Sequence, residues 1–94
     1  MKWKHEPKDK VVAIGETVQL SCEGDGYPEP VIKWSRVGSH EKVNQIGNKL
    51  YILAVSDDDD GRYECLASNA EGEQLRKIVT ISVIGKNQIL RLSN

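Results

Sequence analysis

The stretch DDGRYECLASN, residues 59–69, decides the fold of this chain. Side chains alternate between the two faces of an extended strand, which places one set on the same face: Tyr63, Cys65 and Ala67. Asp59 and Gly61 come just before, where a tight corner needs a short polar side chain and a residue with a permissive backbone. A Tyr two residues before a Cys has the spacing of a tyrosine corner, in which the phenol hydroxyl bonds to the preceding loop. The stretch therefore predicts a strand that begins at a hydrogen-bonded corner.

Two residues upstream complete a longer pattern. The order Cys22, Trp34 and then Asp-x-Gly-x-Tyr-x-Cys over residues 59–65 closely resembles the immunoglobulin domain. The resemblance spans nearly the whole chain and implies an all-β fold, an immunoglobulin-like Greek-key β-sandwich of two antiparallel sheets. It also implies that Trp34 packs against a bridge between Cys22 and Cys65, with Leu50 in the same core signature.

Cys22 and Cys65 are the only cysteines in the chain. A disulfide between them would stabilise the fold by about 4 kcal/mol in the chain-entropy treatment, and it would imply an oxidising compartment. The alternative is a pair of buried thiols that face each other in a cytosolic domain of the muscle type. The compartment argument favours the disulfide.

Composition bounds the size of the molecule and its partners. The 94 residues, with 13 basic and 14 acidic side chains and a formal charge of −1, fit one domain. The net charge of the chain therefore provides no overall electrostatic attraction to nucleic acid or to an anionic membrane. No apolar run reaches the roughly 18 residues of a spanning helix, and residues 1–6 lack the apolar region of a signal peptide. We expect one domain over residues 1–85, followed by a linker, a tail or the start of a next module over residues 86–94.

Alternating patterns predict the other strands. We expect them near residues 3–7, 11–14, 17–23, 31–36, 41–46, 48–55 and 73–84, with a hairpin turn at residues 69–72. The first two would form one kinked strand divided between the sheets, which resembles the I-set class. The inward positions are predicted to be Val18, Leu20, Cys22, Ile32, Trp34, Leu50, Ile52, Val55, Val79, Ile81 and Val83.

The sequence offers no catalytic constellation. Catalysis would need a nucleophile beside a base, or paired carboxylates, whereas His5 and His40 stand alone on a predicted edge and a predicted loop. Residues 57–60 are four consecutive aspartates, but neighbours in an extended corner point in different directions while calcium needs converging oxygens. We expect a solvated acidic corner, no metal, no cofactor and no enzyme.

Binding is therefore expected on a surface. Outward positions on three strands give an apolar centre with a charged rim, as protein interfaces have: Val31, Lys33, Glu64, Leu66, Arg76 and Ile78. Scattered surface aliphatics are the ordinary alternative, and Trp3 is a second candidate that could pack on a neighbouring domain or on its own strand. A basic stripe for glycosaminoglycans is a weaker alternative, interrupted by Glu41 and Glu64: Lys33, Arg36, Lys42, Arg76 and Lys77.

Residues 26–34, 47–52 and 75–83 are similar to modules of neural adhesion molecules of the lachesin and IgLON kind, and residues 34–36 resemble perlecan-type matrix modules. This resemblance implies an extracellular, non-catalytic module of a multidomain adhesion or matrix protein. Its partners would be other proteins, including the same protein on another cell or chain. Two alternatives stay open: an intracellular docking module of a muscle giant protein, and a ligand-binding module of a receptor ectodomain.

Overall fold

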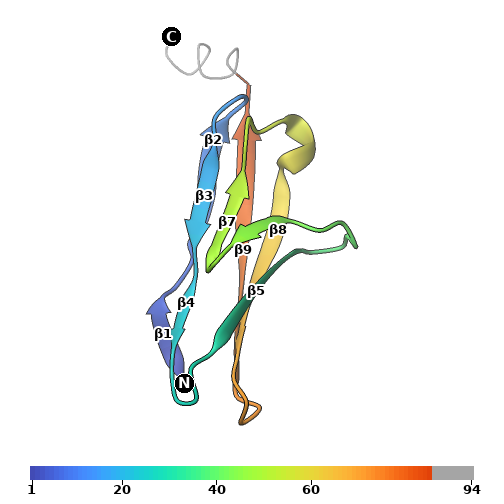
Figure 1. Ribbon diagram of the computed structural model, residues 1–94. Coiled ribbons are helices and arrows are strands. Elements are labelled where there is room, and N and C mark those ends of the chain that lie inside the picture. Colours follow the sequence, from blue (N-terminus) through green and yellow to red (C-terminus); the bar gives the residue numbers. More distant parts are fainter. Residues whose placement is uncertain (86–94) are drawn as a thin grey trace.

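The computed structural model describes residues 1–85, which form two packed layers of strands (Figure 1). One layer is a four-stranded sheet in the order β2 (Lys10–Ala13), β9 (Gln74–Ile84), β8 (Gly61–Ser68) and β5 (Val31–Arg36). The other contains the sheet β3 (Val18–Ser21), β7 (Lys49–Ile52) and β6 (Asn44–Ile46), together with the pair β1 (Lys2–His5) and β4 (Glu23–Asp25). A short 3₁₀ helix, η1, covers Asp57–Asp59. The predicted β-sandwich is confirmed.

The chain changes layers early. β1 pairs with β4 in one layer, whereas β2 pairs with β9 in the other. This confirms the predicted division of the first strand. Because β2 then runs alongside β9 in the same direction, their pairing is parallel, and it is the one departure from antiparallel pairing among residues 1–85.

The core lies between the layers and follows the predicted alternation. Ile32, Ile52 and Val83 are only partly buried and pack against it. Trp3 also packs there, so its ring contacts its own domain, one of the two alternatives considered for it. The buried hydrophobic residues are Val12, Val18, Leu20, Cys22, Trp34, Leu50, Val55, Tyr63, Cys65, Ala67, Val79 and Ile81.

The middle of the chain departs from its predicted boundaries. The strand expected over residues 48–55 ends at Ile52, because Ala54 adopts a left-handed backbone with φ of 49°. Val55 still reaches the core, held by backbone hydrogen bonds with Gly15 (2.8 Å) and Glu16 (2.8 Å). The short strand expected near residues 41–46 is confirmed only as β6, from Asn44 to Ile46.

The predictions for residues 86–94 lie outside the described part of the chain. Among residues 1–85, no helix has the length and apolarity needed to cross a membrane.

Candidate protein-binding face

Strands β5, β8 and β9 present one outward surface, which we call the outer face. Their register places Lys33, Leu66 and Arg76 in one row across the three strands. The next row holds Glu64 and Ile78, and Val31 lies one row away on the other side, opposite Ser68. Because Tyr63, Cys65 and Ala67 point into the core, the intervening side chains of β8 point outward. All six predicted residues therefore share the outer face.

The apolar residues of the outer face follow a diagonal. Val31 is 69% exposed and Ile78 is 44% exposed, while Leu66, half-buried, lies between them on the central strand. Diagonal neighbours on adjacent strands are about 7–8 Å apart, within reach of side chains of this size. The three residues thus form a line of apolar side chains across the sheet rather than isolated positions.

Charged groups flank this line with an excess of cations. Arg76 Nη1 donates to Glu64 Oε1 at 3.1 Å, which neutralises one cation and fixes its position beside Ile78. Such an exposed pair contributes about 0–1 kcal/mol to stability. Within residues 1–85, neither Lys33 nor Arg62 has an ion-pair partner. A partner surface for the outer face would accordingly carry carboxylates around an apolar centre.

The core holds the outer face rigid from behind. The predicted disulfide between Cys22 and Cys65 is present and joins the two layers, with Cα atoms 6.6 Å apart. Trp34 pairs in register with Cys65, and its Nε1 donates to the Asn48 carbonyl oxygen at 3.2 Å. A buried indole usually needs such a partner, so the bond fixes the ring beneath the outer face.

The predicted tyrosine corner is present at the start of β8. Tyr63 Oη donates to the Asp59 carbonyl oxygen at 2.7 Å. The Asp59 carboxylate in turn accepts the Ser56 backbone N–H at 2.8 Å, and Gly61 has φ of 151°. Burial raises the pKa of the Tyr63 phenol, an effect that the nearby Arg36 partly offsets. The corner thus ties the loop before β8 to the buried ring.

The four aspartates do not converge. The carboxylate of Asp59 serves the corner, and Asp60 Oδ2 accepts the Val83 backbone N–H at 2.8 Å. Asp57 and Asp58 are exposed. The described part of the chain contains no group of three or more His, Cys, Asp or Glu side chains placed to hold a metal ion.

The structure draws two residues, Arg36 and Lys77, away from the basic stripe considered for glycosaminoglycans. Lys77 occupies a position of β9 that alternates with the outward-facing ones, and its Nζ lies 3.6 Å from Glu6 Oε1. Arg36 donates to the Asp60 carbonyl oxygen at 2.8 Å and stacks over the Tyr63 ring, with its guanidinium carbon 5.4 Å from the ring centroid. Lys33 and Arg76 share the outer face, and Lys42 lines a hollow together with Lys33.

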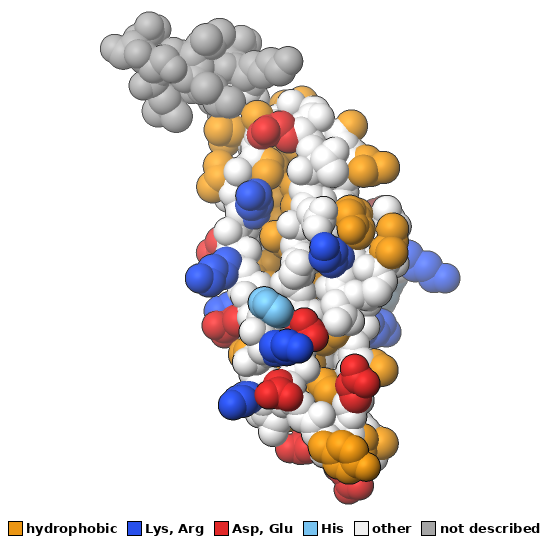
Figure 2. Space-filling view, turned by 60° about the vertical axis from the view of Figure 1, so that its left-hand side comes forward, with side chains coloured by type: hydrophobic (Ala, Val, Ile, Leu, Met, Phe, Trp, Pro, Cys, Tyr) orange, Lys and Arg blue, Asp and Glu red, His pale blue; other side chains and the backbone are white. Residues whose placement is uncertain are grey.

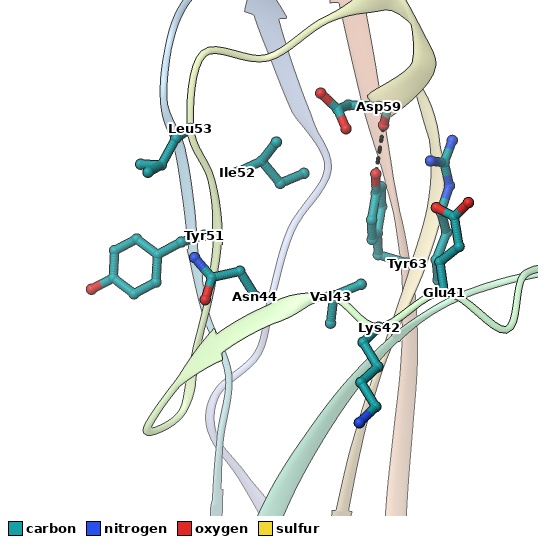
Figure 3. A pocket seen from close by; sticks show the side chains of 10 residues that line it. Glu41, Lys42, Val43, Asn44, Tyr51, Ile52, Leu53, Asp59 and Tyr63 are labelled. Carbon is teal, nitrogen blue, oxygen red and sulfur yellow. Dashed lines mark hydrogen bonds between the residues drawn. The ribbon is translucent and has the colours of Figure 1, made fainter.

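A hollow of about 320 Å³ opens beside the corner, between the β5–β6 loop and the residues around Leu53 (Figure 3). Val43 and Ile52 form part of its floor, and Glu41 and Lys42 lie at its rim (Figure 3). The Tyr63 hydroxyl points to Asp59, as the dashed line shows, and the Asp59 carboxylate accepts the Ser56 backbone N–H, so these two residues of the hollow are engaged in the corner.

Mixed charge covers the other layer. Viewed from the side of β1 and β3, basic and acidic side chains intermingle over the middle of the molecule, and hydrophobic side chains show at both its upper and its lower end (Figure 2). His5 Nδ1 lies 3.0 Å from Glu23 Oε2, and this hydrogen bond, more than Lys4 nearby, lowers the pKa of the Glu23 carboxyl. The His5 side chain is 62% exposed and that of Glu23 is 35% exposed, so the pair resembles a surface ion pair rather than a catalytic dyad.

Two residues of interest were not predicted. Tyr27, in the β4–β5 loop, is 93% exposed, and an aromatic residue among Gly and Pro could have signalled it. Gln45 makes three hydrogen bonds from β6, and nothing in the sequence distinguishes it from other polar strand residues.

Comparison with known proteins places this geometry in a family. The family model described as "Immunoglobulin domain" matches residues 3–69. Roundabout homolog 1 of Rattus norvegicus is 30% identical over 95 residues, which cover 95% of this chain and 6% of that protein. Protein amalgam of Drosophila melanogaster is 32% identical over 92 residues, covering 92% of this chain and 27% of that protein. The chain therefore spans only a small part of these relatives.

Solved structures agree. The first eight domains of Down Syndrome Cell Adhesion Molecule align with a TM-score of 0.78 and 26% identity, covering 88% of this chain and 12% of that one. A domain from the complex of titin M10 with obscurin-like 1 aligns with a TM-score of 0.73 and 25% identity, covering 88% of this chain and 92% of that one.

Proposed function

The chain belongs to the immunoglobulin domain family, and on that basis we propose that it is a non-catalytic, extracellular protein-binding module of a multidomain cell-adhesion or matrix protein. The proposed site is the outer face, with Val31, Leu66 and Ile78 as its apolar centre and Lys33, Glu64 and Arg76 as its charged rim. Partners would be other proteins, including a second copy of the same protein. Residues 1–85 would be the folded module, and residues 86–94 would be a linker, a tail or the start of a next module.

The observation that carries this proposal is the apolar diagonal on a rigid sheet. An exposed apolar line flanked by cations has the anatomy of an interface. The disulfide and the corner hold its backbone in place, so a partner would meet a surface that needs little reordering.

The proposed location depends on the disulfide. Bridges of this kind persist in oxidising compartments and are rare in the cytosol. The likeness to a titin domain is the observation that favours the intracellular alternative. Thiol titration of protein recovered from its native compartment separates the two, because two free thiols at Cys22 and Cys65 would favour the intracellular module.

Binding is tested by charging the apolar line. Leu66→Asp and Ile78→Asp proteins should remain folded, because both positions face outward, and should lose partner binding. The measurement is aggregation of beads coated with the protein, for contacts between copies, and binding of the labelled protein to cultured cells, for other partners.

The matched control is Ile46→Asp, which places the same charge on the opposite layer at a position that is 63% exposed. Equal losses in all three variants, or binding that persists in Leu66→Asp and Ile78→Asp, would contradict the proposed site.

A further inference from the structure

β5 is an edge strand. It pairs with β8 on one side, and within residues 1–85 no strand pairs with its other side. The free edge of a strand presents backbone N–H and C=O groups that can template pairing with another chain. Residues 31–36 contain no proline, so each residue of the strand carries a backbone N–H.

The side chain of Gln45 occupies the centre of this free edge. Its Oε1 accepts the Trp34 backbone N–H at 2.8 Å, and its Nε2 donates to the Ile32 carbonyl oxygen at 2.8 Å. A strand residue in a parallel ladder bonds in the same way, to the C=O of one residue and the N–H of the residue two positions later. The Gln45 amide thus takes the place of one residue of a neighbouring strand.

Gln45 is itself held in position. Its Nε2 also donates to the Gly47 carbonyl oxygen at 2.9 Å, so both amide hydrogens are used. Its backbone pairs with Leu50 in the β6–β7 hairpin, and the Asn48 carbonyl oxygen of the same hairpin accepts the Trp34 indole N–H. The hairpin therefore presents the amide to β5 from a fixed position.

Two hollows lie beside this edge, one on each side of Gln45. A hollow of about 430 Å³ includes Trp34 and Ser35 in its lining, and a second of about 350 Å³ includes Val31 and Ile32. Among the described residues, Gln45 supplies the side chain that hydrogen-bonds to the backbone of this edge.

We propose that Gln45 is an edge guard, which keeps the β5 edge of one copy from pairing with the β5 edge of a second copy. A second copy is the partner because antiparallel pairing of β5 with itself offers the same backbone donors and acceptors on both chains, as a two-fold contact requires. This role is separate from the outer face, since the edge and the face use different groups of β5. With the β5 edge blocked by Gln45, contacts with other chains would be made by side chains of the outer face and not by backbone pairing at the edge.

The test compares Gln45→Ala and Gln45→Met with the wild-type chain by sedimentation over a series of concentrations. Met keeps most of the volume of the side chain but makes neither bond to β5, so it remains informative if the alanine variant does not fold. Gln19→Ala is the matched control, because Gln19 is exposed on β3 and its side chain makes no hydrogen bond within the described residues.

Both Gln45 variants should self-associate at lower concentrations than the wild type and Gln19→Ala. In dilute Gln45 variants, hydrogen exchange of the Trp34 amide should be on the order of tenfold faster than in the wild type, the effect of losing one hydrogen bond. At high concentration that amide should become protected again. A folded Gln45→Met protein that stays monomeric, a Trp34 amide that exchanges as fast in the wild type as in the variants, or association without renewed protection at Trp34 would each overturn the proposal.

Discussion

Replacing Tyr63 by Phe isolates the tyrosine corner, because the ring stays in the core and only the hydroxyl is removed. The lost interaction is the 2.7 Å hydrogen bond to the Asp59 carbonyl oxygen. A hydrogen bond of this kind contributes about 1 kcal/mol to the free energy of unfolding. We expect Tyr63→Phe to lower that free energy by about this amount at neutral pH, with an unchanged slope against urea, since the surface exposed on unfolding is nearly the same.

The same substitution carries a pH signature. Burial raises the pKa of Tyr63 in the folded state above its unfolded value of about 10. The stability linked to this group is therefore complete below that pH, and it is lost as pH rises toward the folded-state pKa. Between the unfolded-state and the folded-state pKa, the free energy of unfolding of the wild type falls by about 1.4 kcal/mol per pH unit. The Phe variant has no phenol at this position and does not show this fall. The stability difference between the two proteins should therefore shrink as pH rises above about 10.

Urea unfolding followed by circular dichroism at a series of pH values measures both effects. Tyr51→Phe is the control, because the Tyr51 hydroxyl makes no hydrogen bond within residues 1–85. The reasoning is refuted if Tyr63→Phe matches the wild type at neutral pH, or if its stability difference stays constant through the alkaline range.

Two further predictions concern the backbone and the bridge. Removing the disulfide with Cys22→Ala and Cys65→Ala together should lower the free energy of unfolding by about 4 kcal/mol, because the bridge joins residues 43 positions apart. Urea unfolding of the double variant measures this loss, and a loss near zero would contradict the prediction. Gly72→Ala should cost about 1–2 kcal/mol through the backbone alone, since Gly72 has φ of 82° and an added Cβ would meet no atom within 4 Å; thermal unfolding measures it, and an Ala variant as stable as the wild type would be incompatible with that φ.

Much of the fold could be predicted because its determinants are local. Alternation along residues 17–23 and 61–68 reports directly which side chains face the core, and the spacing of Tyr63 and Cys65 identifies the corner. The end of β7 could not be predicted in this way. Leu53 and Ala54 continue an apolar run, and only the left-handed backbone of Ala54 shows that the strand has stopped.

The outer face was predictable in membership but not in arrangement. Period-two alternation assigns Leu66 and Ile78 to the outside, yet the register between β8 and β9 decides that Ile78 lies opposite Glu64 and diagonal to Leu66. Gln45 lay beyond prediction for a related reason. Its proposed role depends on the hydrogen bonds that its side chain makes from β6 to the backbone of β5. The local sequence pattern does not report how closely strands of the two layers approach each other.

Alternation on β9 also separates the residues that maintain the fold from those free to bind. Val79 is almost fully buried, so truncating it would leave a cavity in the core and cost stability. Ile78, the preceding residue, is 44% exposed, and a charge there meets water. Lys77, like Val79, lies on the side of β9 opposite to Arg76 and Ile78, and its Nζ is 3.6 Å from Glu6 Oε1. Lys77 is therefore not part of the outer face. Loss of binding in Ile78→Asp without loss of folding can therefore be attributed to the outer face, because the side chain that supports the core is the next one along the strand.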